Sequence, residues 1–158
     1  PVESIARLAS ALRGRALVGA GTVMTEAEVA QVAAAGGALL VTPHADPALV
    51  RAAKARGMLA CPGFFTPAEA FALLRAGADA LKLFPAEAAS PAVLRALRAV
   101  LPPGTAVLPV GGMDAASIPG WRDAGAAGFG IGSALYRPGD TPEAVAGRAR
   151  ALLAALAG

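Results

Sequence analysis

Aromatic residues and clusters of basic residues are both scarce in this chain of 158 residues. Aromatics make up only 4% of the sequence, and the net charge of +3 comes from arginines scattered along its length. Proteins that bind nucleic acids usually show clustered positive charge with interleaved aromatics, so we expect no nucleic-acid partner. Since 56% of the residues are hydrophobic, the core must consist mainly of alanine, valine and leucine.

Cysteine and long apolar runs are scarce too. The single cysteine, Cys61, excludes an intrachain disulfide and fits a reducing compartment. No apolar run approaches the roughly 18 residues of a membrane span, and no signal segment leads the chain. We therefore expect a cytoplasmic globular protein without a membrane partner. No spacing of His, Cys and carboxylate residues suggests a metal, and we expect no cofactor.

Lysine occurs twice, against twelve arginines. Lys54 can lie on the wet face of a helix, whereas Lys82 interrupts the apolar segment 80–85, which is typical of a short buried strand. Burying an ammonium without a partner costs several kcal/mol, so such a lysine normally loses its proton. A neutral lysine attacks carbonyl carbon and forms a Schiff base. A lysine that extends from a strand end toward water is the alternative, and this segment alone does not decide between them.

A pattern of short apolar strands and amphipathic helices repeats along almost the whole chain. Helix starts are marked by the capping boxes Thr25–Glu28 and Thr66–Glu69. Strands buried on both faces and joined by helices indicate a parallel sheet. The expected strands are 16–19, 38–41, 58–61, 80–84, 106–110 and 128–131, after an opening helix at 2–12.

Every expected strand ends in chemically specialised residues, which favours a (β/α)8 TIM barrel over an open doubly wound sheet. In a barrel all strand ends face one mouth, whereas an open sheet concentrates such residues at its switch point. A dinucleotide-binding fingerprint is also missing, since Gly19-Ala-Gly21 lacks its third glycine. The specialised ends are Gly21-Thr22, Thr42-Pro43-His44, Pro62-Gly63, Phe84-Pro85, Gly111-Gly112 and Gly132-Ser133.

The last two strand ends set the strand numbering of the predicted barrel. Gly111-Gly112 and Gly132-Ser133 are glycine-rich loops of the type that binds phosphate, and barrels commonly build that site after strands seven and eight. The six strands are then strands three to eight, and the first strand, first helix and second strand of the barrel are missing. We expect residues 1–158 to form this single, N-terminally incomplete barrel domain.

A Schiff-base lysine facing a phosphate pocket implies a phosphorylated ketone or keto acid as substrate. Lys82 would project into the barrel, and Thr22 and Pro43 would line the opposite rim. Weaker interpretations remain open: the paired glycines as tight turns, Ser133 as a helix cap, Glu87 as a solvated acid at a helix start. His44, the only histidine, is left out of the mechanism.

Six motifs, in order along the chain, resemble the KDPG/KHG aldolase family, whose members are class I aldolases of 2-keto-3-deoxy-sugar-acid phosphates. Valine at position 110 resembles the galactonate-type members of the family, whereas the gluconate-type members carry a threonine at this position. A threonine hydroxyl there could contact the C4 hydroxyl of the substrate and select its configuration, which a valine cannot do. The gluconate type remains the alternative. The six motifs are Gly19-Ala-Gly-Thr-Val23, Val41-Thr-Pro43, Cys61-Pro-Gly63, Leu81-Lys-Leu-Phe-Pro-Ala-Glu87, Val110-Gly-Gly112 and Gly130-Ile-Gly-Ser133.

The resemblance implies roles for these residues. Lys82 would form the Schiff base, and cleavage between C3 and C4 of the substrate would yield pyruvate and D-glyceraldehyde 3-phosphate. Thr22, Pro43 and Phe84 would surround the pyruvate carboxylate. Gly111, Gly112, Gly132 and Ser133 would hold the phosphate, with Val110 beside them. The family uses no metal and commonly forms homotrimers.

The resemblance also implies a deficiency. The family's general acid/base glutamate and a carboxylate-binding arginine lie on its first two strands, and Pro1 matches the proline just after the second. A positioned general acid/base contributes on the order of 10²–10⁴-fold. We therefore expect the 158-residue chain to be impaired, and a catalytically inactive, truncated phosphate-binding barrel is a further alternative.

Overall fold

The computed structural model describes residues 1–157, and the chain divides into two compact units, Pro1–Lys82 and Leu83–Gly158. In the first unit, strands β1 (Gly19–Ala20), β2 (Leu39–Val41) and β3 (Leu59–Cys61) pair in parallel in the order β1-β2-β3. A second sheet has the order β4 (Gly63–Phe64), β5 (Leu81–Leu83) and β6 (Val107–Pro109). The division of the chain falls within β5, directly after Lys82.

Pro62 is the reason that the first unit shows β3 and β4 as separate strands. Proline has no backbone N–H and cannot donate to a ladder, so the pairing is interrupted there. The carbonyl of Pro62 nevertheless accepts a hydrogen bond from the Lys82 N–H at 2.9 Å. The carbonyl of Ala60 accepts from Asp79 and Ala80. Residues 59–64 therefore form one continuous extended segment that pairs with the segment before and in β5. The short strand β4 was not expected from the sequence.

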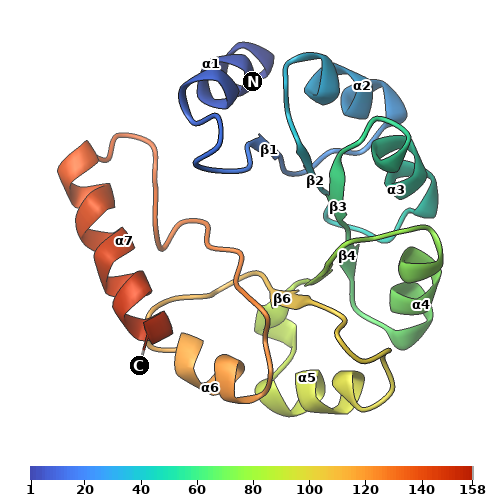
Figure 1. Ribbon diagram of the computed structural model, residues 1–158. Coiled ribbons are helices and arrows are strands. Elements are labelled where there is room, and N and C mark those ends of the chain that lie inside the picture. Colours follow the sequence, from blue (N-terminus) through green and yellow to red (C-terminus); the bar gives the residue numbers. More distant parts are fainter. Residues whose placement is uncertain (158) are drawn as a thin grey trace. The chain divides into compact units, whose positions relative to one another are not determined.

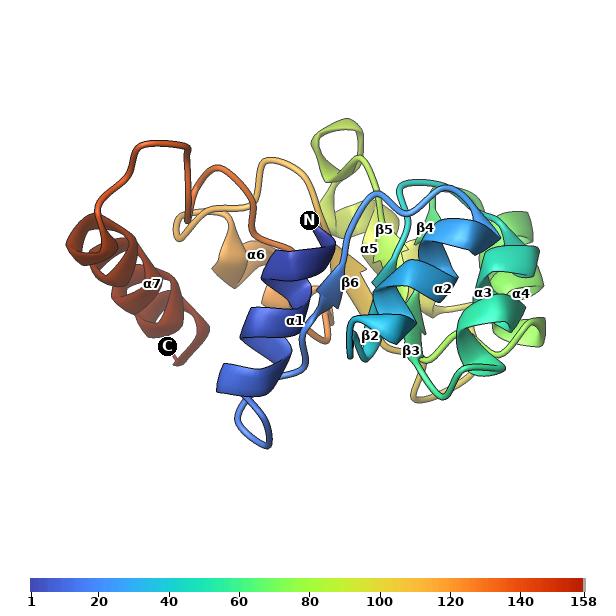
Figure 2. The same cartoon turned by 90° about the horizontal axis from the view of Figure 1, so that it is seen from above.

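Four helices belong to the first unit: α1 (Val2–Ala11), α2 (Glu26–Ala34), α3 (Pro47–Lys54) and α4 (Pro67–Arg75). The side chains of Thr25 and Thr66 accept hydrogen bonds from the N–H groups of Glu28 and Glu69, and both capping boxes are confirmed. Helix α3 packs beside both α2 and α4, as Figure 2 shows. All three lie on one side of the strands of this unit (Figure 1).

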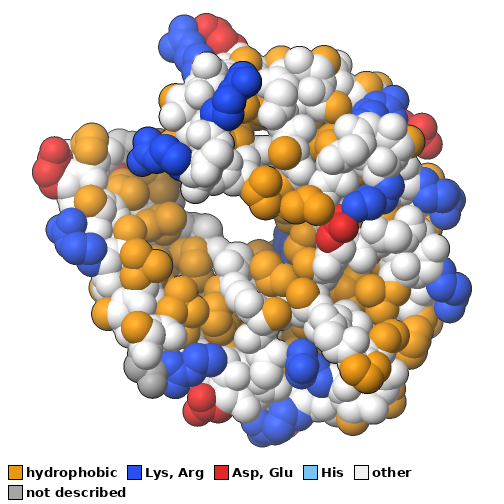
Figure 3. Space-filling view, in the orientation of Figure 1, with side chains coloured by type: hydrophobic (Ala, Val, Ile, Leu, Met, Phe, Trp, Pro, Cys, Tyr) orange, Lys and Arg blue, Asp and Glu red, His pale blue; other side chains and the backbone are white. Residues whose placement is uncertain are grey.

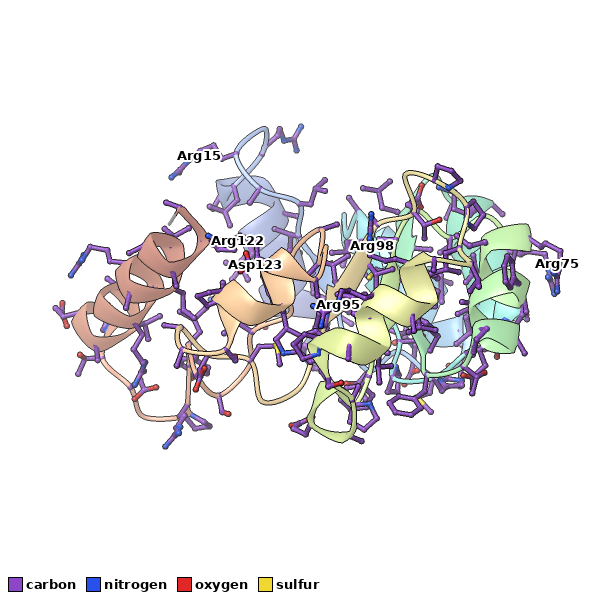
Figure 4. All side chains as sticks on the ribbon, turned by 90° about the horizontal axis from the view of Figure 1, so that it is seen from below. Arg15, Arg75, Arg95, Arg98, Arg122 and Asp123 are labelled. Atoms are coloured by element: carbon purple, nitrogen blue, oxygen red, sulfur yellow. The ribbon has the colours of Figure 1, made fainter. Side chains whose placement is uncertain are left out.

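The second unit contains the short helix η1 (Ala86–Ala88) and three α-helices, α5 (Pro91–Arg98), α6 (Ile118–Asp123) and α7 (Pro142–Ala157). Helix α6 packs against both α5 and α7. Arg98 on α5, labelled in Figure 4, donates a hydrogen bond to the carbonyl of Thr105. The aliphatic part of the Arg98 side chain packs against Gly125, because a methyl group added at position 125 would lie 2.9 Å from Arg98 Cδ. Glycine at position 125 (φ +94°) therefore ends α6 and leaves room for this arginine.

The predicted strand at 128–131 is present only as an isolated parallel bridge between Val110 and Gly130. The segment still follows β6, because the N–H groups of Ala127 and Gly130 donate to the carbonyls of Val107 and Pro109, both at 3.0 Å. Its alternating glycines weaken strand formation, since they supply no side chains to pack. The first strand is also displaced, from the predicted 16–19 to 19–20.

The buried residues of each unit are almost all aliphatic, as expected from the composition. In the first unit, Leu40, Leu49, Met58 and Leu81 are among the largest fully buried side chains. In the second unit Leu83, Leu94, Val107 and Ile118 take this place. The fold is a parallel α/β fold, as predicted. No helix within residues 1–157 combines the length and apolar character needed to cross a membrane.

An ion pair in the first unit fixes the turn that leads into β5. Lys54 Nζ lies 2.8 Å from both carboxylate oxygens of Asp79, and Asp79 Oδ2 also accepts the Ala60 N–H at 2.8 Å. Burial opposes ionisation of Asp79, but these hydrogen bonds outweigh it and hold the pKa of the carboxyl below its usual value. Lys54 therefore has a structural partner, Asp79.

We predict that Gly19→Ala is markedly more destabilising than Gly21→Ala. A methyl group at Gly19 would overlap the Leu39 carbonyl and approach Leu39 Cβ to 2.7 Å, whereas nothing lies within 4 Å of one at Gly21. Overpacking of this kind costs about 2 kcal/mol. Urea unfolding should show a lower midpoint for Gly19→Ala at an unchanged slope. Equal midpoints for the two variants would contradict the β1–β2 contact.

Candidate active site

Lys82 lies on β5 between the fully buried Leu81 and Leu83 and is itself only 8% exposed. Burial disfavours its ammonium form and lowers the pKa of Lys82 below its usual value, an effect that nearby Cys61 opposes only in part. A lysine in this state carries a larger fraction of neutral amine near pH 7 than an exposed one. This side chain therefore has the environment that nucleophilic attack on a carbonyl requires.

Cys61 ends β3 as a buried, free cysteine. Burial raises the pKa of its thiol to about 11, although the charge of Lys82 favours the thiolate. The thiol is therefore neutral near pH 7 and provides no anion to keep Lys82 protonated. These properties fit a small buried side chain and not a second nucleophile.

The backbone around Pro43 is held by hydrogen bonds of the Thr42 side chain, which the sequence analysis did not predict. The fully buried Thr42 donates its hydroxyl hydrogen to the His44 carbonyl at 2.7 Å and accepts the Gly63 N–H at 3.2 Å. A methyl group at Gly63 would lie 2.6 Å from the Pro43 carbonyl carbon. Thr42 and Gly63 thus fix the backbone that carries Pro43. His44 Nδ1 is buried without a hydrogen-bond partner among the described residues.

Thr22 follows β1 with φ +58°, the only non-glycine residue with positive φ among those described. This conformation is unfavourable for a β-branched residue and costs about 1–3 kcal/mol. Thr22 lines a cavity of about 260 Å³ together with Gly21, Val23 and residues of α1 and α2. Because Thr22 is exposed, burial of its side chain does not explain the strained backbone.

The second unit contains a cavity of about 350 Å³, which we call the glycine pocket. Six of the residues predicted to contact substrate line it, so the structure brings them together. They are Phe84, Val110, Gly111, Gly112, Gly132 and Ser133; the other lining residues are Glu87, Met113, Asp114, Gly130, Ala134 and Arg137. Lys82, Thr22 and Pro43 belong to the first unit.

The glycine-rich wall of the glycine pocket is made by loops and not by helix ends. Gly111 and Gly112 have φ of +109° and +65°, which favour glycine. Helix α6 begins only at Ile118 and α7 at Pro142, so no helix begins at Ser133 and the weaker interpretation of Ser133 as a helix cap is wrong. Any anion here would be bound by loop amides and side chains.

Glu87 lies against the glycine pair. A methyl group at Gly111 would overlap Glu87 Oε2, and one at Gly112 would lie 2.8 Å from Glu87 Cγ. The interpretation of Glu87 as a solvated acid at a helix start is therefore incomplete. The residue is exposed and is the middle residue of η1, but its carboxylate lies in the glycine pocket.

Arg137 and Asp114 were missed by sequence reasoning, because both lie in irregular loops where no periodicity selects them. Arg137 Nε donates to the Ser133 carbonyl at 3.2 Å. Asp114 Oδ1 accepts the Ser117 N–H at 2.8 Å, and this bond holds the pKa of Asp114 below its usual value. Arg137 is the one cationic side chain among the described residues that line the pocket.

Val110 and Gly130 fit together as a pair in the wall of the pocket. They form the isolated parallel bridge, and a methyl group at Gly130 would overlap the γ-methyl groups of Val110. The branched side chain at 110 therefore requires glycine at 130. Among residues 1–157, no group of three His, Cys, Asp or Glu side chains is placed to hold a metal ion.

The chain is similar in sequence and structure to known aldolases. Residues 2–142 match the family described as KDPG and KHG aldolase. The 2-dehydro-3-deoxy-6-phosphogalactonate aldolase of Escherichia coli (strain K12) is 44% identical over 153 residues, which are 97% of this chain and 75% of that protein.

Two solved structures are also 44% identical and each gives a TM-score of 0.95 over 98% of this chain. One is described as a native KDPGal structure, of which the match covers 75%. The other is a porous protein cage designed by fusing symmetric oligomeric domains, of which it covers 57%. These matches extend over nearly the whole sequence, and the chain belongs to the KDPG and KHG aldolase family.

Proposed function

We propose that this protein is a class I aldolase that cleaves 2-dehydro-3-deoxy-6-phospho-D-galactonate to pyruvate and D-glyceraldehyde 3-phosphate through a Schiff base on Lys82. The observation that carries the proposal is the burial of Lys82, which is only 8% exposed and has a lowered pKa. This lysine lies on a strand in a chain that belongs to the KDPG and KHG aldolase family. The galactonate-type substrate is supported by the 44% identity to an aldolase of that name and by Val110.

The proposed reaction begins when Lys82 Nζ attacks the C2 carbonyl carbon of the substrate. The carbinolamine that forms loses water and becomes an imine. Breaking the C3–C4 bond then sends its electron pair toward the imine nitrogen, while the C4 hydroxyl loses its proton and becomes the aldehyde of D-glyceraldehyde 3-phosphate. Protonation of the resulting enamine at C3 and hydrolysis by water release pyruvate and restore the lysine.

The remaining site residues are proposed to bind the two ends of the substrate. Thr22, Pro43 and Phe84 would surround the pyruvate carboxylate. The strain at Thr22 supports this role, because strained residues cluster at binding sites. The phosphate would be held by Gly111, Gly112, Gly132 and Ser133, which line one cavity of the second unit.

We also propose that the strands belong to a (β/α)8 barrel, as strands three to eight, in a single aldolase-type domain over residues 1–158, and that the protein forms a homotrimer. An oligomer is supported by the match to a cage built from symmetric oligomeric domains. Large apolar side chains of α7 are also exposed, with Leu153 63% and Leu156 42% accessible. Figure 3 shows the hydrophobic side chains along this helix.

The first experiment is reductive trapping. Incubation with pyruvate and borohydride should attach a pyruvate-derived group to Lys82, which peptide mapping distinguishes from Lys54, the only other lysine. Lys82→Arg should abolish the adduct, and Lys54→Arg should retain it. A catalytically inactive phosphate-binding barrel would give no adduct. The absence of the adduct from a folded sample would therefore contradict the Schiff-base assignment.

The lowered pKa of Lys82 predicts an early rise of trapping with pH. The neutral amine is the attacking species, and its fraction grows as the pH approaches the pKa from below. The rate of adduct formation with pyruvate and cyanoborohydride should therefore reach half its plateau below pH 10.5, the ordinary lysine value. A midpoint at or above that value would show that burial does not activate Lys82.

The specificity assigned to Val110 predicts that the Val110→Thr variant shifts its substrate preference toward the gluconate epimer. Threonine has nearly the shape of valine, so the contact with Gly130 should persist, while its hydroxyl can hydrogen-bond the C4 hydroxyl of the substrate. The ratio of trapped adduct from the gluconate epimer to that from the galactonate epimer should rise about tenfold. An unchanged ratio in folded Val110→Thr would remove Val110 from the specificity assignment and leave the gluconate-type alternative open.

A further inference from the structure

The glycine pocket is lined by side chains of both positive and negative charge, although it is proposed to bind a phosphate dianion. Three described lining residues carry charged side chains: Arg137, Glu87 and Asp114. Asp114 is engaged in a local turn, where Oδ1 accepts the Ser117 N–H and the Ser117 hydroxyl donates to the Asp114 carbonyl. Asp114 stays ionised in this turn, but Arg137 is bonded to Ser133 and Glu87 lies against Gly111 and Gly112, so the charges of these two side chains act on a ligand most directly.

Arg137 is anchored so that its backbone is fixed. Its N–H donates to Asp140 Oδ2 at 2.5 Å, and its Nε donates to the Ser133 carbonyl. Arg148 on α7 donates from Nη2 to the same carboxylate oxygen and from Nε to the Leu135 carbonyl. Residues 133–140 are thereby held at several points, with Ser133 and Arg137 together on the pocket wall.

The guanidinium of Arg137 has donors beyond Nε. Arginine carries five N–H groups in a planar fork that matches phosphate geometry. The bond from Nε to Ser133 ties the arginine to a residue that is itself proposed to contact phosphate. A phosphate that reaches the Gly132 and Ser133 loop would therefore meet the positive charge as well.

Glu87 acts in the opposite sense. Its carboxylate lies against Gly111 and Gly112 and fills the space that a Cβ at either position would need. This is the wall from which backbone amides would approach an anion. A phosphate and the carboxylate at this wall are like charges, which repel.

We propose that Arg137 and Glu87 set the phosphate affinity of the glycine pocket in opposite directions: Arg137 binds the phosphate, and Glu87 weakens its binding by competing for the wall of Gly111 and Gly112. The inference rests on the proposed function for the identity of the ligand. It adds two ligand-affecting side chains to a site otherwise built from glycines and one serine. It also assigns Glu87 a role in product release, since a repelled phosphate leaves faster.

The test measures binding of inorganic phosphate and of D-glyceraldehyde 3-phosphate by calorimetry. Arg137→Gln should weaken binding of both about tenfold, the loss expected for a charge-assisted contact. Glu87→Gln should strengthen binding of both about threefold, the effect of removing one nearby like charge in a solvated site. Arg137→Lys should retain part of the affinity, because the charge remains.

Matched controls remove the same charges elsewhere in the second unit. Arg95 on α5, labelled in Figure 4, and Glu143 on α7 are exposed and do not line the glycine pocket. Arg95→Gln and Glu143→Gln should leave both affinities unchanged. Thermal unfolding of every variant identifies any that fail to fold, and Arg137→Lys then carries the test of position 137.

The outcomes separate this inference from the proposed function. Unchanged phosphate binding in folded Arg137→Gln, or unchanged or weaker binding in Glu87→Gln, overturns the charge assignment. Pyruvate trapping on the same samples needs no phosphate and tests the aldolase chemistry alone. A Lys82 adduct with unaltered phosphate binding would therefore reject this inference only, whereas opposite shifts without an adduct would reject the lysine chemistry only.

Discussion

Removal of one ammonium group from water is the constraint on which the proposed chemistry depends. Lys82 is buried on a strand whose neighbouring residues, Leu81 and Leu83, are fully buried, and its backbone N–H donates to the Pro62 carbonyl. Cys61 lies near it as a neutral thiol and supplies no compensating anion. The strand that carries Lys82 is thus fixed by backbone bonds.

The two lysines of the chain differ in what surrounds their ammonium groups. Lys54 is about one-third exposed and held at 2.8 Å by a carboxylate that is also bonded to a backbone N–H. Lys82 has a lowered pKa because desolvation is its largest influence. Proteins place reactive groups where burial and neighbouring charges shift ionisation, and the contrast within this chain follows that rule. The sequence, with two lysines among 158 residues and one of them inside an apolar segment, already directed attention to Lys82.

Sequence reasoning predicted most of the fold because each level of the chain agrees with the others. Helix starts at Thr25 and Thr66 follow from local hydrogen bonding, which a sequence displays directly. The break at Pro62 and the loss of the strand at 128–131 depend on ladder partners distant in sequence, so they were not predicted. Six of the expected site residues line one cavity because glycine and strand-end signals are local. Arg137, Asp114 and the contact of Glu87 with the glycine pair were missed, since loop side chains carry no period and find their partners only in three dimensions.

The pairing of Val110 with Gly130 constrains how this site can evolve. Because the space next to Gly130 is already filled by the branches of residue 110, a side chain at position 130 would require a smaller residue at 110 at the same time. Valine and threonine have nearly the same volume, so exchange between them changes polarity without disturbing the contact. If position 110 distinguishes substrate epimers, a lineage can move between the two preferences in one substitution and remain folded at every step. The glycine at 130 would then persist through such changes, because either side chain at 110 fills the space beside it.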